Sequence, residues 1–384
     1  MQCTEQRKKA ERAEMRVAIF TETFLPKRDG VVTILCQALD ALEDAGIEVC
    51  VYAPPSAPHA YRQMRVYPSW GPRFPLYQEL YCSMPTIAGV RGILSFKPDV
   101  IHVMNPTFIG TVGVIMAIIG RVPLIASVHM DIDYYVRQYA GSWGLPIAWT
   151  FFKVWHNRAR INLAPSTAMV NQLTENGIER VRHWSRGIDT SRFCRTPMNA
   201  QIRTSFLGDK PNALVILYVG RLTAEKGIDS LLPFCNDPRY RVVLVGGGHH
   251  EAQTLARFAH TDALFTGVLI GSAVVEAYAA ADIFVFPSVS ESFGLAPLEA
   301  MACGLAVVAP YVGGLRDTLI PDENCKTYDH TDPSALSHVV DALAEDADER
   351  RRIATNGAHY AAQRSQGQSM QELITLYRQL AHAH

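Results

Sequence analysis

Short runs of consecutive apolar residues alternate with longer segments of helical periodicity along the chain. The run at 15–22 is continuous and β-branched, and a loop with Pro, Asp and Gly follows it, which is typical of a buried strand in a parallel sheet. A helix is expected at 31–46, ended by Gly46. Further strands are expected at 47–54, 98–104, 122–129 and 160–166.

The same alternation begins again after a less regular stretch near 190–211. Strand–helix–strand units with right-handed crossovers build doubly wound sheets. The sequence therefore predicts an α/β protein of two Rossmann-like domains that face each other across a cleft at the carboxyl ends of both sheets. In the second half, strands are expected at 213–221, 240–248, 262–268, 281–288 and 305–310.

Five segments follow from this pattern. The tail is charged but has no apolar core, so it is not a secretory signal, and we expect it to be mobile. The longest apolar stretch, 108–120, is shorter than the roughly 20 residues that span a bilayer, so it is predicted as a buried helix. The expected segments are a tail (1–14), an N-terminal domain (15–190), a linker (191–211), a C-terminal domain (212–360) and a last helix (361–384) that packs back on the N-terminal domain.

Composition is that of an ordinary globular protein, with 48% hydrophobic and 19% charged residues and a net charge of −1, which does not favour a nucleic-acid binder. The charge is uneven: residues 1–190 hold 20 Lys and Arg against 16 Asp and Glu, whereas 191–384 hold 16 against 21. The basic first half suits an anionic membrane surface or substrate, or is simply an unevenly solvated surface. The eight cysteines show no zinc or Cys-x-x-Cys spacing, and we expect buried free thiols.

The densest chemical signal is the segment ADIFVFPSVSESFGLAPLEAMACGLAVVAPYVGG at 281–314. A strand is expected to end at Pro287, a loop carries Glu291, and the next helix carries Glu299 in its early turns. Carboxylates suit hydroxyl groups, so Glu299 is predicted to accept from a ribose and Glu291 from a sugar. The alternative is a helix with an ordinary solvated pair of glutamates.

The start of that helix favours an anion. Backbone N–H groups of Phe293, Gly294 and Leu295 would point at phosphate oxygens, and the helix dipole favours negative charge there. Gly294 has no side chain that would block close approach. The segment therefore predicts a diphosphate site.

A second signal is LYVGRLTAEKGIDSLL at 217–232. Arg221 ends a strand and Lys226 opens the next helix, so both cations can balance a diphosphate and stabilise its departure. Taken alone, they are equally well a solvated surface pair.

These two segments resemble the retaining GT-B glycosyltransferases of glycosyltransferase family four, and the resemblance covers about residues 15–380. That family carries two glutamates with seven residues between them, here Glu291 and Glu299, and an Arg…Lys pair, here Arg221 and Lys226. The resemblance implies that the cations hold the donor diphosphate, Glu299 the ribose and Glu291 the transferred sugar.

The resemblance implies four further site residues. Val268 and Leu269, after the strand FTGV, would lie beside the nucleobase. In the N-terminal domain, the family often has two adjacent glycines after the first strand; here the pair is Asp29-Gly30, so only Gly30 is carried over. His129 matches a histidine near the reacting sugar, and the alternative is a core histidine.

The stretch 127–166 resembles sulfoquinovosyl-diacylglycerol synthases and relatives that mannosylate or glucosylate lipids, as do 184–189 and 74–80. Three tryptophans, Trp143, Trp149 and Trp155, lie in it. An aromatic amphipathic segment suits a lipid acceptor or a peripheral membrane contact through the N-terminal domain, and it equally suits a core helix.

Two other patterns resemble binding sites. Asp131 and Asp133 have the Asp-x-Asp spacing of a metal–diphosphate site, but Arg221 and Lys226 already supply the neutralisation, so no metal is expected; either aspartate could face the acceptor. Gly246 and Gly248 hint at a dinucleotide fingerprint but lack its third glycine, so they are predicted to allow tight helix–strand packing.

The sequence therefore predicts a retaining, metal-independent hexosyltransferase without a cofactor, using a UDP- or GDP-sugar and a lipid or glycan acceptor. The predicted catalytic residues are Glu291, His129, Arg221 and Lys226. The expected location is the cytoplasm, including the inner face of a membrane. The alternatives are a nucleotide-sugar epimerase of the same fold, a non-catalytic nucleotide-sugar-binding protein and, more distantly, a dehydrogenase.

Overall fold

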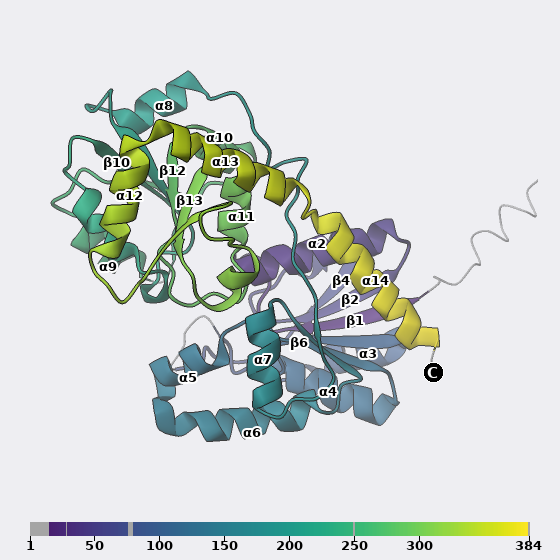
Figure 1. Ribbon diagram of the computed structural model, residues 1–384. Coiled ribbons are helices and arrows are strands. Elements are labelled where there is room, and N and C mark those ends of the chain that lie inside the picture. The colour runs from purple at the N-terminus through teal and green to yellow at the C-terminus, as the bar shows by residue number, and fades with distance from the viewer. Residues whose placement is uncertain (1–14, 28, 76–79, 249, 383–384) are drawn as a thin grey trace, which may run out of the picture. The chain divides into compact units, whose positions relative to one another are not determined.

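The computed structural model describes residues 15–27, 29–75, 80–248 and 250–382 (Figure 1), so the tail at 1–14 lies outside the described residues. The chain divides into two compact units: unit 1 holds the residues up to Ser185 and those from Gly367 onward, and unit 2 is Arg186–Gln366. The stretch 191–211, expected to be a linker, belongs to unit 2, because Phe193 and Phe206 are buried in its core.

The sheet of unit 1 is parallel apart from one edge strand. Its order is β3-β4-β2-β1-β5-β6-β7-β8, and only β3 runs antiparallel to its neighbour. From β1 the chain builds outward in one direction and from β5 in the other, so the topological switch point lies between these two strands. The strands are β1 (Arg16–Thr21), β2 (Glu48–Ala53), β3 (Ala60–Tyr61), β4 (Met64–Pro68), β5 (Val100–Met104), β6 (Leu124–Ser127), β7 (Ile161–Ala164) and β8 (Val181–His183).

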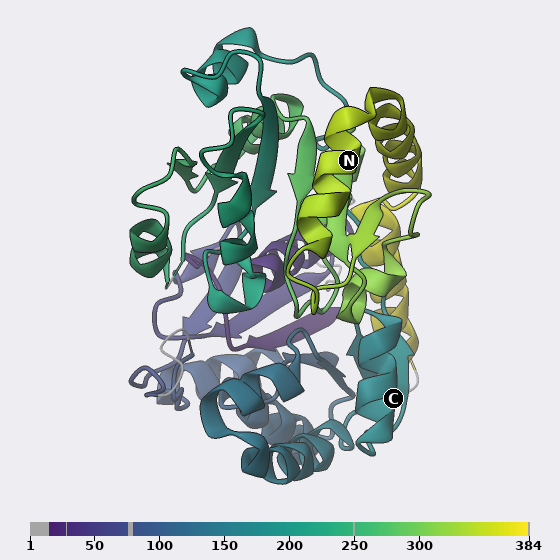
Figure 2. The ribbon, with the colours of Figure 1, turned by 60° about the vertical axis from the view of Figure 1, so that its left-hand side comes forward.

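Helices cover both faces of this sheet. Alternate strand residues such as Phe20 and Val103 pack in a cluster with α3 and α4, and Figure 2 shows the blue helices of this part of the chain together along one side of the strands. The last helix, α14, buries Leu373, Ile374 and Tyr377 within unit 1. The helices are α2 (Gly30–Asp44), α3 (Ile87–Phe96), α4 (Ile109–Gly120), α5 (Ile132–Ala140), η1 (Ser142–Gly144), α6 (Leu145–His156), α7 (Thr167–Glu175) and α14 (Gln366–His382).

The helix expected at 108–120 is present as α4, but the prediction that it is buried is wrong for one of its faces. Ile115, Ile118 and Ile119 are 41%, 49% and 76% exposed, whereas Val114 and Ala117 pack on the sheet. One face of α4 therefore carries exposed isoleucines. Within the described parts of the chain, no helix has the length and hydropathy that crossing a bilayer requires.

Unit 2 repeats the doubly wound pattern with six parallel strands. The order β11-β10-β9-β12-β13-β14 places its switch point between β9 and β12. The prediction of an α/β fold with two doubly wound sheets is thereby confirmed. The strands are β9 (Leu214–Val219), β10 (Tyr240–Val245), β11 (Leu264–Gly267), β12 (Ile283–Val285), β13 (Ala306–Pro310) and β14 (Lys326–Tyr328).

The longest described helices of unit 2 are the last two along the chain, α12 with 11 residues and α13 with 16. Three of the other described helices are 3₁₀ helices, two of which follow β9 directly. The helices are α8 (Ala200–Leu207), η2 (Ala224–Lys226), η3 (Ile228–Phe234), α9 (Glu251–Arg257), α10 (Ser272–Ala279), α11 (Leu295–Ala302), η4 (Gly313–Asp317), α12 (Ala335–Glu345) and α13 (Ala347–Ala362).

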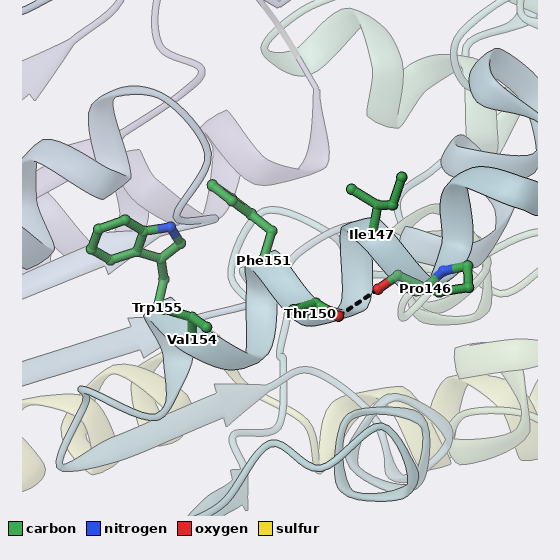
Figure 3. Close-up of a pocket in the computed structure, with 6 residues that line it drawn as sticks. All are labelled: Pro146, Ile147, Thr150, Phe151, Val154 and Trp155. Carbon is green, nitrogen blue, oxygen red and sulfur yellow. Dashed lines mark hydrogen bonds between the residues drawn. The ribbon is translucent and has the colours of Figure 1, made fainter.

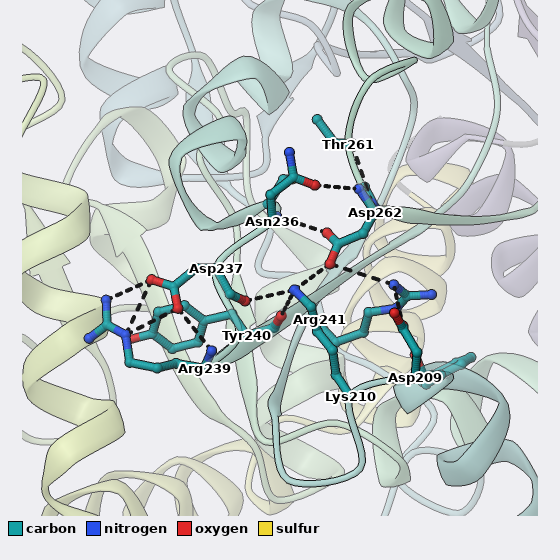
Figure 4. A network of polar contacts seen from close by, with 12 residues as sticks. Asp209, Lys210, Asn236, Asp237, Arg239, Tyr240, Arg241, Thr261 and Asp262 are labelled. Atoms are coloured by element: carbon teal, nitrogen blue, oxygen red, sulfur yellow. Dashed lines mark hydrogen bonds and ion pairs between the residues drawn. The ribbon is translucent and has the colours of Figure 1, made fainter.

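A polar network ties the amino ends of β9, β10 and β11 together (Figure 4). Lys210 pairs with Asp262 and also donates to the backbone oxygens of Asp237 and Tyr240 at 2.7 and 3.1 Å. The Asn236 N–H donates to Asp262 at 2.9 Å. Burial opposes the charge of Asp262, but these bonds hold its pKa below the ordinary value.

The expectation of buried free thiols holds for part of the set. Cys50, Cys235, Cys303 and Cys325 are buried and free. Cys194, by contrast, is exposed, and Cys36 and Cys82 are partly so. Cys50 and Cys303 lie in apolar runs, which explains their burial, whereas Cys194 lies exposed on an irregular segment.

Candidate active site

Lys226 and Glu291 meet at the switch point of unit 2. Lys226 ends η2, just after β9, and Glu291 lies in the loop after β12, so adjacent strands deliver both side chains to one place. They form an ion pair in which each side chain is only 12% exposed. The ammonium also lies 5.7 Å from the centre of the Phe286 ring, which attracts a cation.

Arg221 stands at the end of β9 beside a second carboxylate. Its guanidinium lies 3.0 Å from Glu225, one helical turn along the chain. The buried Tyr218 hydroxyl donates to the Arg221 backbone oxygen at 2.7 Å, which fixes the bend where the strand ends. Arg221 and Lys226 therefore both lie on the short segment between β9 and η3, each beside an acid.

The helix expected to begin near 293–295 is α11, which starts at Leu295. Gly294 occupies its N-cap position with φ +95°, and a Cβ there would come within 2.4 Å of the Leu315 side chain. Only glycine suits both conditions. Among the described residues no side chain caps this helix, so its first N–H groups have no side-chain acceptor, as an anion site requires. Phe293 is buried just before it.

Gly314 packs against the backbone of the loop that carries Glu291. The Gly314 N–H donates to the Glu291 backbone oxygen at 2.8 Å. A Cβ on Gly314 would come within 2.2 Å of the Ser292 backbone oxygen. Any larger residue at 314 would therefore displace the loop that carries Glu291.

Glu299 lies on the buried side of α11 and accepts a hydrogen bond from the Tyr278 hydroxyl at 3.1 Å. Burial raises its pKa to about 7, against the opposing effects of Tyr278 and the charge of Arg192. A carboxylate with this pKa changes charge near neutral pH, and it gains from hydroxyl donors that favour its ionised form.

The loops after β11 and β10 hold the other residues of unit 2 that the sequence analysis singled out. Val268 follows β11 and is 60% exposed, whereas Leu269 packs partly on the core. The sequence predicts that the glycines at 246–248 allow a helix to pack on a strand. For Gly246 this is wrong, because a Cβ there would come within 1.8 Å of the Gly220 backbone oxygen, which lies in the loop after β9. Gly246 and Gly248 let the loops after β9 and β10 pack together, whereas a Cβ on Gly247 would meet the side chains of Glu251 and Val268 at 3.1 Å.

In unit 1, Gly30 is the first residue of α2. Asp29, whose charge would be unwelcome near phosphates, is the N-cap: its side chain accepts from the Val32 N–H at 2.9 Å and pairs with Lys27 at 3.0 Å. Its charge is thus engaged by the helix start and a lysine.

His129 is buried two residues after β6. Its backbone N–H donates to the Asn105 side chain at 2.9 Å, and its Nε2 lies 2.7 Å from the Ser127 hydroxyl. The next acids serve the local fold. Asp131 caps α5 through the Tyr134 N–H at 3.1 Å, and Asp133 accepts from the Trp149 indole at 2.8 Å. Among described residues, no three His, Cys, Asp or Glu side chains cluster as metal ligands.

The structure adds a carboxylate that the sequence analysis missed. Glu22, directly after β1, is 6% exposed and accepts from the Gly110 N–H at 2.9 Å near the start of α4. Burial raises its pKa to about 7. An acid at the end of a continuous apolar strand, followed by a Pro and Gly loop, is the signal that could have identified it.

Two family models match the chain. The model described as "Glycosyltransferase Family 4" matches residues 28–192, and that described as "Glycosyl transferases group 1" matches residues 203–360. Together they cover most of units 1 and 2, including every predicted site residue.

Individual proteins give the same result. A "GDP-mannose-dependent alpha-mannosyltransferase" of Mycobacterium tuberculosis is 35% identical over 342 residues, covering 85% of this chain and 88% of the relative. The "Sulfoquinovosyl transferase SQD2" of Arabidopsis thaliana is 31% identical over 294 residues, 74% of this chain and 57% of that protein. The structure of a sucrose-phosphate synthase from Thermosynechococcus elongatus superposes with a TM-score of 0.77 at 20% identity, covering 97% of this chain and all of that one, which shows the GT-B fold.

Proposed function

The chain belongs to the glycosyltransferases of group 1 and family 4, and from that premise we propose that it transfers mannose from GDP-mannose to a hydroxyl of a lipid or glycan acceptor, with retention of configuration and without a divalent metal. The donor binds unit 2, and unit 1 supplies the acceptor side.

The observation that carries this proposal is the Lys226–Glu291 pair. Among the described residues, Glu291 is the only polar side chain that hydrogen-bonds the Lys226 ammonium, so N–H donors remain for a ligand. A diphosphate would take Lys226, and Glu291 would then accept from hydroxyls of the sugar. The uncapped start of α11 follows three residues after Glu291 and supplies further donors to the phosphates.

The donor is assigned from the relatives' printed names. The mannosyltransferase relative is more similar and matches more of this chain than the sulfoquinovosyl transferase. GDP-mannose is therefore the first choice, and a UDP-sugar is the second. Glu299 would hold the ribose that both donors share.

In the proposed reaction the bond between the anomeric carbon and the leaving phosphate oxygen breaks. The acceptor oxygen bonds to the same face of that carbon, and its proton passes to the departing diphosphate. Negative charge develops on the diphosphate, where Arg221, Lys226 and the N-terminus of α11 stabilise it, so these groups take the part of a metal ion. Glu291 positions the sugar and supports its developing positive charge.

We further propose that α4 and α6 of unit 1 rest on an anionic bilayer. Ile119 on α4 and Ile147 on α6 are 76% and 63% exposed, and both helices pack on one cluster through Met116 and Trp155. Figure 3 shows Ile147, Phe151 and their neighbours along a shallow hollow of about 480 Å³. Exposed isoleucines and aromatics insert favourably at a membrane interface.

The charge around these helices favours anionic lipid. The sequence has no Asp or Glu between residues 100 and 130, nor between 134 and 174. Arg121, Lys153 and Arg158 in those stretches are exposed. Each such cation adds about 1 kcal/mol of attraction near an anionic surface.

Vesicle sedimentation tests this surface. Wild type should bind vesicles containing phosphatidylglycerol and bind neutral phosphatidylcholine vesicles weakly, and Ile119→Asp should reduce binding to the former about tenfold. Met198→Asp, at a 54% exposed methionine of unit 2, is the matched control. Equal binding to both vesicle types, or equal loss in both variants, would overturn the proposal.

A donor panel tests the reaction itself. GDP- and UDP-sugars are incubated with the protein and vesicles of mixed bacterial lipids, and released nucleotide and glycosylated product are measured with and without EDTA. We expect GDP release from GDP-mannose, an α-linked product by NMR and no effect of EDTA. An inverted product contradicts retention. Sugar interconversion without net nucleotide release would indicate an epimerase, and tight binding without turnover a binding protein.

A further inference from the structure

Four buried side chains of unit 1 form a continuous hydrogen-bonded chain that ends at His129. Tyr377 Oη lies 2.5 Å from His102 Nδ1, His102 Nε2 lies 2.9 Å from Ser127 Oγ, and Ser127 Oγ lies 2.7 Å from His129 Nε2. His102, Ser127, His129 and Tyr377 are 2%, 0%, 7% and 0% exposed. This hydrogen-bonded relay of Tyr377, His102, Ser127 and His129 therefore connects the last helix, through the sheet, to a predicted site residue.

The fold explains why these side chains meet. His102 on β5 pairs in register with Ile125 on β6, and Ser127 lies two residues further along β6. Residues two apart point to the same face of a sheet, so His102 and Ser127 are diagonal neighbours. Tyr377 reaches that face from α14, and its ring contacts the His102 ring edge-on.

The direction of the hydrogen bonds follows from satisfying each donor. Within the described residues, His102 is the only polar partner of the buried Tyr377 hydroxyl, so this hydroxyl must donate to Nδ1 of His102. His102 then carries its proton on Nε2 and donates it to Ser127. The one hydrogen of Ser127 is left for Nε2 of His129.

This sequence of donors sets the state of His129. Its Nε2 accepts, so its own proton lies on Nδ1. A protonated or reversed His129 would donate to Ser127 as well, and the Ser127 hydrogen would then lose its acceptor in a buried place. We propose that Tyr377, His102 and Ser127 are positioning residues that hold His129 as the neutral tautomer with its proton on Nδ1, so that α14 controls the hydrogen-bonding state of the site.

The inference rests on the proposed function only for its consequence in catalysis. A histidine held with a fixed donor nitrogen can donate to the donor sugar or its phosphate without having to change tautomer on binding. The tautomer itself is a property of the free protein.

The first experiment reads that tautomer directly. The full chain is labelled with ¹⁵N-histidine, the His129 signals are assigned with His129→Asn, and ring nitrogen shifts are compared in wild type and Tyr377→Phe. Wild type should show Nδ1–H at His129. Loss of the Tyr377 hydroxyl lets the chain reverse, so Nε2–H should grow. Ser369→Ala is the matched control, because it removes another buried bond of α14, 2.6 Å to the Ser185 oxygen, outside the relay.

The second experiment asks whether Tyr377 acts through His129. Tyr377→Phe should lower kcat about tenfold with little change in the donor KM, while Ser369→Ala leaves kcat unchanged. In the His129→Ala background, Tyr377→Phe should cause no further loss, because residues acting through one partner are not additive. Ser127→Ala, which cuts the relay at its centre, repeats the test should Tyr377→Phe fail to fold.

The outcomes separate the two claims. An unchanged His129 tautomer in both relay variants, or additive losses with His129→Ala, overturns the relay. A tautomer shift in a protein that shows no sugar transfer leaves the relay standing and overturns the proposed function.

Discussion

Unit 2 carries two lysine–carboxylate pairs of similar depth at opposite ends of its sheet. Lys210–Asp262 lies at the amino ends of the strands and Lys226–Glu291 at the carboxyl ends, with side chains 15% and 22%, and 12% and 12% exposed. Lys210 is also bound to two backbone oxygens, whereas the described residues give Lys226 one polar side-chain partner. The first pair closes a structural network, and the second keeps hydrogen-bonding capacity for a ligand.

The two ion pairs differ in their place on the sheet and in what surrounds them. Both pairs neutralise their charges and both join distant parts of the chain. Only the carboxyl-edge pair lies at a switch point, next to the uncapped start of a helix. On the proposed function, the first pair stabilises the fold and the second binds the donor.

Replacing the acid of each pair should separate an effect on catalysis from an effect on stability. Glu291→Ala should lower kcat for transfer about 10³-fold with little change in melting temperature, because it removes support for the reacting sugar. Asp262→Ala should do the reverse, lowering stability by about 1–3 kcal/mol with near-normal kcat. Steady-state kinetics and thermal melts of both proteins decide. Near-normal transfer by the Glu291 variant would remove it from the site.

The arginines extend the test. Arg221→Ala should reduce kcat about 10²-fold, because one donor to the developing charge is lost. Arg239→Ala, whose ion pair with Asp237 is 2.8 Å long and 53% exposed on the arginine side, should change neither kcat nor stability appreciably. Equal rates for the two variants would contradict the role of Arg221.

The pKa of Glu299 predicts a pH effect on donor binding. Because burial raises its pKa to about 7, the carboxylate is ionised above that pH and protonated below it. Ribose hydroxyls donate to the ionised form, so the Kd for GDP should rise as pH falls below 7, by at most about tenfold per unit. Calorimetric titration from pH 8 to 6 measures it, and Glu299→Gln should flatten the slope. A wild-type Kd for GDP that does not change with pH would contradict a contact between Glu299 and the ribose.

The smallest expected effect concerns Glu22. Its pKa in the folded chain, about 7, lies above that of an unfolded chain, so its contribution to stability is complete below about pH 4.5 and is lost as pH rises through 7. Glu22→Gln should weaken this decline by about 1–3 kcal/mol, and Glu48→Gln, at an exposed position, should not. Urea unfolding at pH 5 and 8 compares them, and parallel slopes for all three proteins would show that Glu22 does not cause the decline.

How far the sequence predicts the site depends on whether its residues are neighbours in the chain. In unit 2 the motif residues share two short segments, and the expected start of α11 agrees with the structure. In unit 1 the partners of His129 come from β5 and from α14, with His102 and Tyr377 275 positions apart. No local sequence pattern marks two residues so far apart as partners. The relay could therefore be recognised only from the three-dimensional structure.

One expectation of the sequence analysis is corrected for a local reason. The helix at 108–120 was predicted as buried because it lacks polar residues, yet apolar composition does not show which face is covered. Its exposed isoleucines support the proposed membrane contact.

The most direct test of the account is GDP release from GDP-mannose by three proteins under one condition. Wild type and Lys210→Ala should release GDP at similar rates, and Lys226→Ala should be about 10²–10³-fold slower. Similar rates for wild type and Lys226→Ala would contradict the claim that the pair at the carboxyl edge of unit 2 holds the donor.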